Sequence, residues 1–157
     1  MGSITIEGGH RLGGDVTVQG AKNSVLPILA ATLLCGGECR IRRCPHLRDV
    51  DAAADILRYL GCKVDWSDGD LLVDSRVLTR CDIPQTLMRR MRSSVIFLGA
   101  ILARCGWAEL SYPGGCELGP RPIDLHLAAL RTLGASIEER GGKLYCQARH
   151  LTGGQIV

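Results

Sequence analysis

The feature that most constrains the fold of this chain is an internal sequence repeat. The segment AKNSVL at residues 21–26 has a counterpart, MRSSVI, 70 positions later at residues 91–96. The segment LRYLGCKV at residues 57–64 matches LRTLGASI at residues 130–137, at an offset of 73. Repeats of this kind encode a supersecondary unit that buries its apolar face against its neighbours. We therefore expect two units with the same order of helices and strands.

Residue types that end helices and form turns define the elements of the first copy, repeat 1 at about 21–80. Gly36-Gly37 and Gly61 are expected to end two helices, and Asp49 or Asp51 to cap the second one. The sequence Ser67-Asp68-Gly69-Asp70 predicts a hairpin turn. The expected elements are a mostly apolar helix at about 22–35, a strand at about 38–42, a helix near 50–60 and two strands flanking 67–70.

The second copy, repeat 2 at about 81–150, contains three extra residues, and they fall around Cys116. An insertion at one place in a repeat of otherwise matched length indicates an added functional loop. The elements expected in this copy are a helix at 92–105, a strand at 107–112, the Cys116 loop, a helix at 122–133 and two strands about Gly141-Gly142.

A third copy is expected to begin at the end of the chain. The sequence GGQIV at residues 153–157 resembles GGDVT at residues 13–17, at an offset of 140, which is twice 70. We interpret the chain as part of a longer protein in which the third repeat is truncated.

Composition indicates an ordinary globular protein and excludes several classes of function. The 157 residues are 46% hydrophobic and 22% charged, which suits one soluble domain. A net charge of +3 without a long basic run, and only 4% aromatic residues, argue against a nucleic-acid partner. The longest apolar run, residues 25–35, is too short to span a bilayer, and there is no secretion signal, so we expect no membrane partner and a cytoplasmic location.

Eight cysteines are present, and none is spaced as C-x-x-C or paired with a histidine. A zinc site is therefore not expected, and most of these thiols should behave as small buried apolar groups. We expect neither a metal nor an organic cofactor.

The loop that contains Cys116 carries the chemistry. Its sequence, YPGGCELGPRPIDLH at residues 112–126, places the cysteine among glycines, five residues before Arg121 and near the start of a predicted helix. Pro122 suits the first helical position, and the free amides of Ile123 and Asp124 would then face an anion. A thiol near a helix N-terminus and a guanidinium ionises more readily, which favours nucleophilic or acid–base chemistry on an anionic substrate.

The two copies, the GAKN segment at residues 20–23 and the PGGC loop at residues 113–116 together resemble the family of UDP-N-acetylglucosamine enolpyruvyl transferases, over about residues 4–157. The resemblance implies an α+β fold, an inside-out barrel of two domains that each contain three helix-and-strand units. Residues 1–20 would form a strand segment of the other, absent domain. Residues 21–157 would form an incomplete substrate-binding domain with two units and the start of a third, and the partner would be the missing C-terminal part of the same protein.

The reaction implied by the resemblance transfers the enolpyruvyl group of phosphoenolpyruvate to the 3-hydroxyl of UDP-N-acetylglucosamine. Cys116 matches the catalytic general acid of the family and the site of attack by fosfomycin. The residues implied in binding phosphoenolpyruvate are Lys22, Asn23 and Arg121, and those implied in binding UDP-N-acetylglucosamine are Arg92, Arg121, Pro122, Ile123, Asp124 and Leu125.

Several of these residues also have a simpler interpretation, and for Arg121 it is an ion pair with Glu117 or Asp124. Cys116 taken alone resembles one more structural thiol, and Lys22 a solvated residue before a helix. Arg92 follows two other arginines, so a solvated basic turn is the alternative to an anion site. Asp124 suits a helix-start carboxylate, and His126 a packing or surface histidine. The alternative functions are a non-catalytic module that binds nucleotide sugars or anions, and an inactive structural stub.

Overall fold

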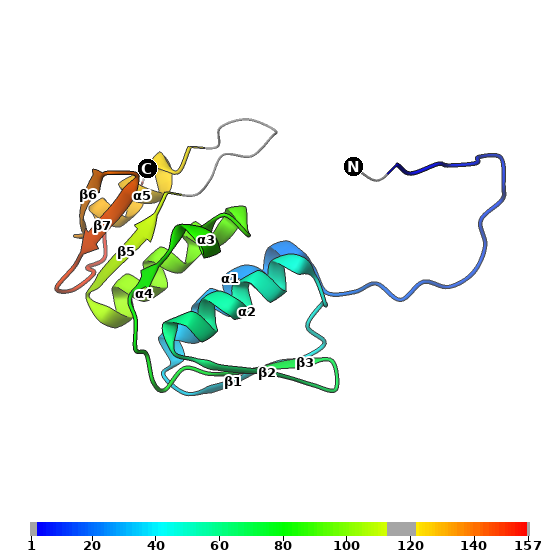
Figure 1. Ribbon diagram of the computed structural model, residues 1–157, viewed down its shortest axis with the longest axis horizontal. Coiled ribbons are helices and arrows are strands. Elements are labelled where there is room, and N and C mark those ends of the chain that lie inside the picture. The colour runs from blue at the N-terminus through cyan, green and yellow to red at the C-terminus, as the bar shows by residue number, and fades with distance from the viewer. Residues whose placement is uncertain (1–2, 113–121, 157) are drawn as a thin grey trace.

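The computed structural model describes residues 3–112 and 122–156 and contains two helix-and-strand units (Figure 1). The first unit follows the order predicted from the sequence. Its elements are α1 (Lys22–Cys35), β1 (Glu38–Ile41), α2 (Arg48–Leu60), β2 (Lys63–Ser67) and β3 (Asp70–Asp74).

The second unit repeats this order and adds two short elements before it. The added elements are β4 (Asp82–Ile83) and α3 (Gln85–Met88), and the repeated ones are the 3₁₀ helix η1 (Arg92–Ile96) with α4 (Phe97–Cys105), then β5 (Trp107–Ser111), α5 (Asp124–Thr132), β6 (Ser136–Arg140) and β7 (Lys143–Gln147).

The two sheets have the same topology, which confirms the repeat in three dimensions. Their strand orders are β1-β3-β2 and β5-β7-β6, all antiparallel, and β4 adds to β5 in parallel. In the first sheet Asp74 lies between Glu38 and Lys63. In the second, Gln147 lies between Trp107 and Ser136 in the same way. The hairpins expected around residues 67–70 and about Gly141-Gly142 are therefore confirmed.

The core lies between the two sheets, where α1, α2 and α4 pack together (Figure 1). The matching helices α1 and α4 contact each other directly, and α1 also contacts α2. Leu29 and Leu33 of α1, together with Phe97 and Ile101 of the second unit, have no exposed surface. Burial on this scale is the main driving force for the arrangement.

Glycines end the first two helices as predicted. Gly36 has a φ of 58° and Gly61 a φ of 110°, the left-handed conformation that ends helices. The start of α2 differs from the prediction. Leu47 occupies the cap position, so Asp49 and Asp51 lie in the first turn, where their carboxylates still face the positive end of the helix.

The second unit differs from the prediction at two helix starts. The helix expected at 92–105 begins with one 3₁₀ segment, η1, before α4. The helix expected from Pro122 begins at Asp124, with Ile123 as its N-cap at φ −110° and ψ 10°. Pro122 is therefore outside the helix, and its assignment to the first helical position is wrong.

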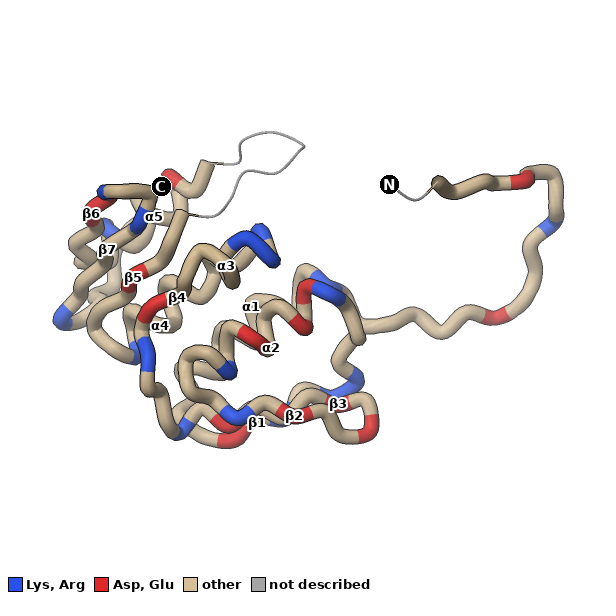
Figure 2. The backbone as a smooth tube through the Cα atoms, in the orientation of Figure 1, with Lys and Arg blue, Asp and Glu red and all other residues tan. Residues whose placement is uncertain are grey.

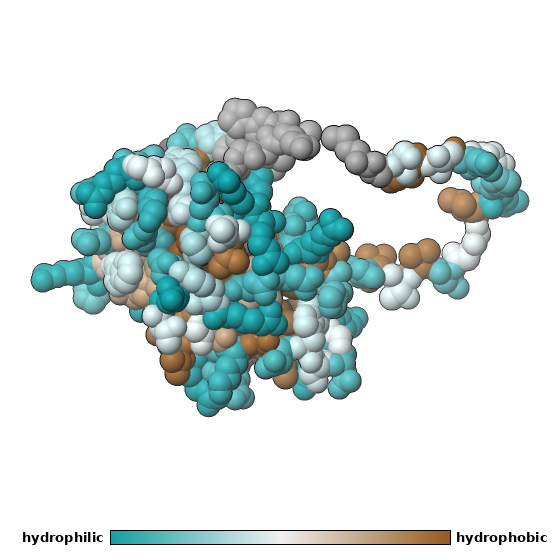
Figure 3. Space-filling view, in the orientation of Figure 1, coloured by the Kyte–Doolittle hydropathy of each residue, from teal (hydrophilic) through white to brown (hydrophobic). Residues whose placement is uncertain are grey.

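Residues 3–21 contain no helix or strand, and their side chains are exposed. The segment extends away from the packed units and carries apolar residues on its surface (Figures 1 and 3). Among them are Ile4, Ile6, Val16 and Val18. The assignment of residues 1–20 to another domain stays a prediction.

Replacing Gly61 with alanine should destabilise the chain more than the same change at Gly69. Both glycines have a positive φ, which costs an L-residue about 1–2 kcal/mol. A Cβ at Gly61 would also lie 2.8 Å from the Thr79 nitrogen, which donates a hydrogen bond to the Leu60 carbonyl, whereas a Cβ at Gly69 meets nothing. We expect Gly61→Ala to lower the free energy of unfolding by about 2–4 kcal/mol in urea denaturation. Equal losses in the two variants would contradict this reading.

Candidate functional site

The predicted cations lie at the beginnings of the two matching helices. Lys22 is the first residue of α1 and Arg92 the first residue of η1, and α1 contacts η1. Figure 2 shows basic residues near the beginning of α1 and at the turn after α3. The fold thus brings together the helices that carry two of the sequence-predicted binding residues.

The N-terminus of α1 has the features of an anion-binding helix end. The amides of Ser24 and Val25 donate to the Ala21 carbonyl, each at 3.1 Å, so the amides of Lys22 and Asn23 precede the first hydrogen-bonded turn. The first turn contains no acidic residue, and no side chain caps it. Positive potential at this end therefore favours a negative ligand.

Lys22 is paired with an acid from the neighbouring helix. Its Nζ lies 2.9 Å from Oδ2 of Asp49, in the first turn of α2. The Lys22 side chain is 52% exposed and that of Asp49 is 31% exposed, so the ion pair is accessible to solvent. The sequence-based reasoning did not predict this partner because the two residues lie on different helices.

Among the residues that the structure describes, no acid pairs with Arg92. Its Nη1 atom is buried and has no hydrogen-bond partner in the part of the chain that the structure describes. The repeat explains the difference, since the position 73 residues after Asp49 is occupied by Pro122. The second unit therefore has a proline where the first unit has the acid that pairs with its cation. Arg92 as a whole is half-buried, and its buried nitrogen without a described partner makes this position a candidate contact for an anion.

The start of α5 presents the remaining described candidates. Pro122, Asp124 and Leu125 are exposed, and Leu125 is 81% exposed, while Ile123 packs against the core. Cys116 and Arg121 lie outside the described residues. The described part of the segment is therefore accessible to a ligand, and Ile123 anchors it.

His126 shares with Arg92 a feature that the sequence-based reasoning missed. Its Nε2 atom is buried and unpaired among the described residues, and burial lowers the pKa of the imidazole below its ordinary value. The equivalent position in the first unit, 73 residues earlier, is the fully buried Ala53. Aligning the two copies residue by residue would have revealed this imidazole in place of a methyl group.

The described cysteines are all free thiols. Cys44, Cys62 and Cys146 are buried, Cys39, Cys81 and Cys105 are half-buried, and Cys35 is exposed. Burial raises the pKa of Cys62 and Cys146 to about 11, so these two thiols stay protonated near neutral pH.

The described residues contain no group of three or more histidine, cysteine or acidic side chains that could hold a metal ion. None of the described helices has the length and apolar character needed to cross a membrane.

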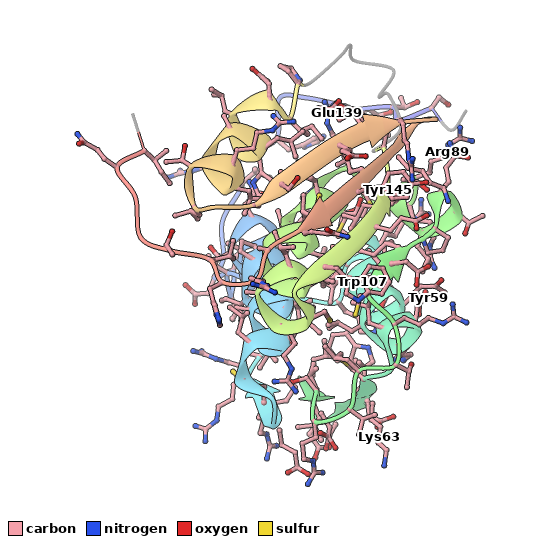
Figure 4. All side chains as sticks on the ribbon, turned by 90° about the vertical axis from the view of Figure 1, so that its left-hand side faces the viewer. Tyr59, Lys63, Arg89, Trp107, Glu139 and Tyr145 are labelled. Carbon is pink, nitrogen blue, oxygen red and sulfur yellow. The ribbon has the colours of Figure 1, made fainter. Side chains whose placement is uncertain are left out.

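The charged face of the second sheet lies apart from the helix ends just described. Figure 4 shows Trp107, Tyr145 and Glu139 on this sheet. The guanidinium of Arg140 stacks over the Tyr145 ring at 4.5 Å, and Lys143 bonds to Glu109 at 2.6 Å. These charged groups therefore have partners on the sheet, in contrast to the buried nitrogens of Arg92 and His126, which no described residue hydrogen-bonds.

Comparison with known proteins defines the class to which this fold belongs. Residues 6–157 match the family described as EPSP synthase (3-phosphoshikimate 1-carboxyvinyltransferase), and the chain belongs to this family.

Within the family, the chain is similar to proteins named for one particular activity. It is 51% identical over 156 residues to UDP-N-acetylglucosamine 1-carboxyvinyltransferase 2 of Caldanaerobacter subterraneus subsp. tengcongensis. It is 47% identical over 159 residues to UDP-N-acetylglucosamine 1-carboxyvinyltransferase of Prosthecochloris aestuarii. Each match covers 99% of this chain and 37% of the relative, so the chain spans about a third of the length of these proteins. The resemblance drawn from the sequence is confirmed.

Solved structures support the same fold. The enolpyruvyl transferase NikO from Streptomyces tendae superimposes with a TM-score of 0.78 at 26% identity, covering 92% of this chain and 32% of that one. EPSP synthase from Acinetobacter baumannii gives a TM-score of 0.55 at 17% identity, covering 91% and 33%, and supports the fold alone. The expected α+β fold of enolpyruvyl transferases is confirmed.

Replacing Arg92 with methionine should leave the free energy of unfolding unchanged or raise it. The substitution removes an unpaired buried nitrogen and breaks no hydrogen bond among the described residues. Arg58→Met is the control, because Arg58 donates to the Val64 carbonyl at 2.8 and 3.2 Å and pairs with Asp55. Urea denaturation should show a loss of about 1 kcal/mol for Arg58→Met only. A similar loss for Arg92→Met would mean that Arg92 has a structural role.

The unpaired imidazole should also make stability depend on pH. Because the pKa of His126 is lowered in the folded state, the unfolded chain binds the proton first as the pH falls below about 6.5. The free energy of unfolding should therefore decrease between about pH 7.5 and 5.5, and decrease less in His126→Gln. Parallel pH profiles for the two proteins would show that His126 is not the titrating group.

Proposed function

We propose that the full-length protein transfers the enolpyruvyl group of phosphoenolpyruvate to the 3-hydroxyl of UDP-N-acetylglucosamine and releases phosphate, the first committed step of peptidoglycan synthesis. The names of its relatives support this assignment. The observation on this chain that carries it is the buried nitrogen of Arg92, which no described residue hydrogen-bonds, together with the matching cation Lys22 at the start of the helix next to η1. Both proposed substrates are anionic, as such a site requires.

In this proposal the described residues bind and orient the two substrates. Lys22 and Asn23, with Arg121, hold phosphoenolpyruvate at the positive end of α1. Arg92 and the segment from Arg121 to Leu125 hold the nucleotide sugar, which the exposure of Leu125 permits. Cys116 acts as general acid and protonates the methylene carbon of phosphoenolpyruvate while the sugar hydroxyl adds to the neighbouring carbon. A base of the whole protein takes the proton of the sugar hydroxyl in this addition. The adduct then loses phosphate from the carbon that carries the sugar oxygen and a proton from its new methyl group, which restores the carbon–carbon double bond and gives the product.

The domain organisation is part of the proposal. Residues 21–157 would supply two units of the substrate-binding domain, and residues 1–20 a strand of the other domain. Ile28 and Leu34 of α1 are 50% and 55% exposed, which suits a helix that a further unit covers in the whole protein. A second domain closing over the substrates would complete the site, so we propose that this chain alone has little turnover. Its work in peptidoglycan synthesis would take place in the cytoplasm.

Alkylation by fosfomycin tests the proposal on this chain. We expect one adduct by intact mass, faster when UDP-N-acetylglucosamine is present, and absent from Cys116→Ser. The matched control is Cys35→Ser, because Cys35 is the exposed thiol among the described residues and should be dispensable. The raised pKa values of Cys62 and Cys146 keep these two thiols unreactive under the same conditions.

Two outcomes would count against the proposed site. An adduct that survives in Cys116→Ser, or adducts spread over several thiols, would mean that Cys116 is not specially activated. An adduct formed at the same rate with and without the nucleotide sugar would mean that the described helix ends do not bind it.

A further inference from the structure

We propose that Asp49 is an internal competitor for the anion-binding ammonium of Lys22. In the free protein the Asp49 carboxylate forms an ion pair with this ammonium, and an anionic group of the ligand takes the place of the carboxylate when the ligand binds. This inference rests on the proposed function, because it takes Lys22 as a contact of phosphoenolpyruvate. It assigns to Asp49 a positioning role that acts through Lys22.

The geometry suits an exchange of partners. Asp49 is fixed in the first turn of α2, next to Val50, which is fully buried. Lys22 extends its ammonium from the first turn of α1 to Oδ2 of Asp49 at 2.9 Å. Because about half of the Lys22 side chain is exposed, a ligand can reach the ammonium without unfolding either helix.

The repeat provides an internal comparison. The second unit has Pro122 at the position of Asp49, and its cation Arg92 has a buried nitrogen that no described residue hydrogen-bonds. Among the described residues, the second unit keeps its fold without an acid opposite its cation. In the first unit the Asp49 carboxylate stabilises the N-terminus of α2, as Asp51 does, and in this proposal it also holds the Lys22 ammonium until a ligand replaces it.

Asp51 is a natural control for the other effects of a carboxylate at this place. It lies in the same first turn of α2, so both acids stabilise the positive end of the helix. Its charge acts on Cys44. Burial is the main cause that raises the pKa of the Cys44 thiol, and the Asp51 carboxylate raises that pKa further. Asp49, in contrast, contacts Lys22. A change specific to Asp49 therefore reports on the ion pair and not on the helix end.

The first experiment measures the dissociation constant of phosphoenolpyruvate for the 157-residue chain by calorimetry. Exposed ion pairs are weak, so Asp49→Asn should bind the ligand about two- to fivefold more tightly than wild type, and Asp51→Asn as wild type does. Lys22→Gln should weaken binding, and adding Asp49→Asn to it should bring no gain. No gain in Asp49→Asn over Asp51→Asn, or a gain that persists without Lys22, would overturn the competition.

The second experiment observes the ammonium itself. The chain has three lysines, Lys22, Lys63 and Lys143, so their side-chain nitrogen resonances can be assigned by substitution. Saturating phosphoenolpyruvate should shift the Lys22 resonance in wild type away from its value in the ion pair. In Asp49→Asn without ligand, the Lys22 resonance should already have the value of an ammonium outside the ion pair. The resonance of Lys143, which pairs with Glu109, should stay unchanged when the ligand is added. A ligand that binds while the Lys22 resonance keeps its ion-paired value would overturn the inference.

The two experiments separate the inference from the proposed function. If Lys22→Gln binds phosphoenolpyruvate as wild type does, the assignment of Lys22 to this ligand fails, and the inference fails with it. If Lys22→Gln weakens binding while Asp49→Asn equals Asp51→Asn, the proposed function survives and only the inference is overturned.

Discussion

Contact between the matching helices α1 and α4 is the interaction on which the rest of the structure depends. Helix α1 is apolar on most sides, and its position between α2 and α4 lets it bury Leu29 and Leu33 completely. Its buried hydroxyl, on Thr32, donates to the Leu29 carbonyl at 2.6 Å. Ser75 then donates to the Thr32 carbonyl at 2.7 Å, which fixes the chain leaving β3 against the same helix. Each sheet covers its own unit, and this helix pair joins the units.

The same contact determines how the site is arranged. Because α1 also contacts η1, the two segments that these cations begin pack against each other. The environments of the two cations nevertheless differ. Lys22 is exposed and paired with an acid, while Arg92 has a buried nitrogen that no described group satisfies. The two units thus share their packing but differ in the surroundings of the cation that begins the matching helix.

Local signals in the sequence predicted most elements of the fold. The ends of α1 and α2 were predictable because Gly36 and Gly61 adopt a conformation that other residues avoid. The hairpins were predictable because the turn residues lie next to alternating strands. In contrast, β4 has only two residues, and it is a strand because β5 lies beside it. The cap at Leu47 and the 3₁₀ start at Arg92 likewise depend on packing, which a local pattern does not contain.

For the site, the sequence predicted the cations but not their surroundings. The pairing of Lys22 with Asp49 joins two helices, and the unpaired nitrogens are properties of burial.

The segment between the units has a consequence for recombination among relatives. Thr79 and Arg80 both donate their amides to the Leu60 carbonyl in the first unit, and Cys81 accepts a hydrogen bond from Glu109 in the second. The backbone hydrogen bonds of this segment therefore change from one unit to the other between Arg80 and Cys81, while the Tyr59 hydroxyl of the first unit donates across this point to Asp82 at 2.6 Å. A crossover between homologous genes at the Arg80–Cys81 peptide bond would have to preserve the contacts with Leu60 on one side and those with Glu109 on the other. The two units are consequently better exchanged as a single block than as separate modules.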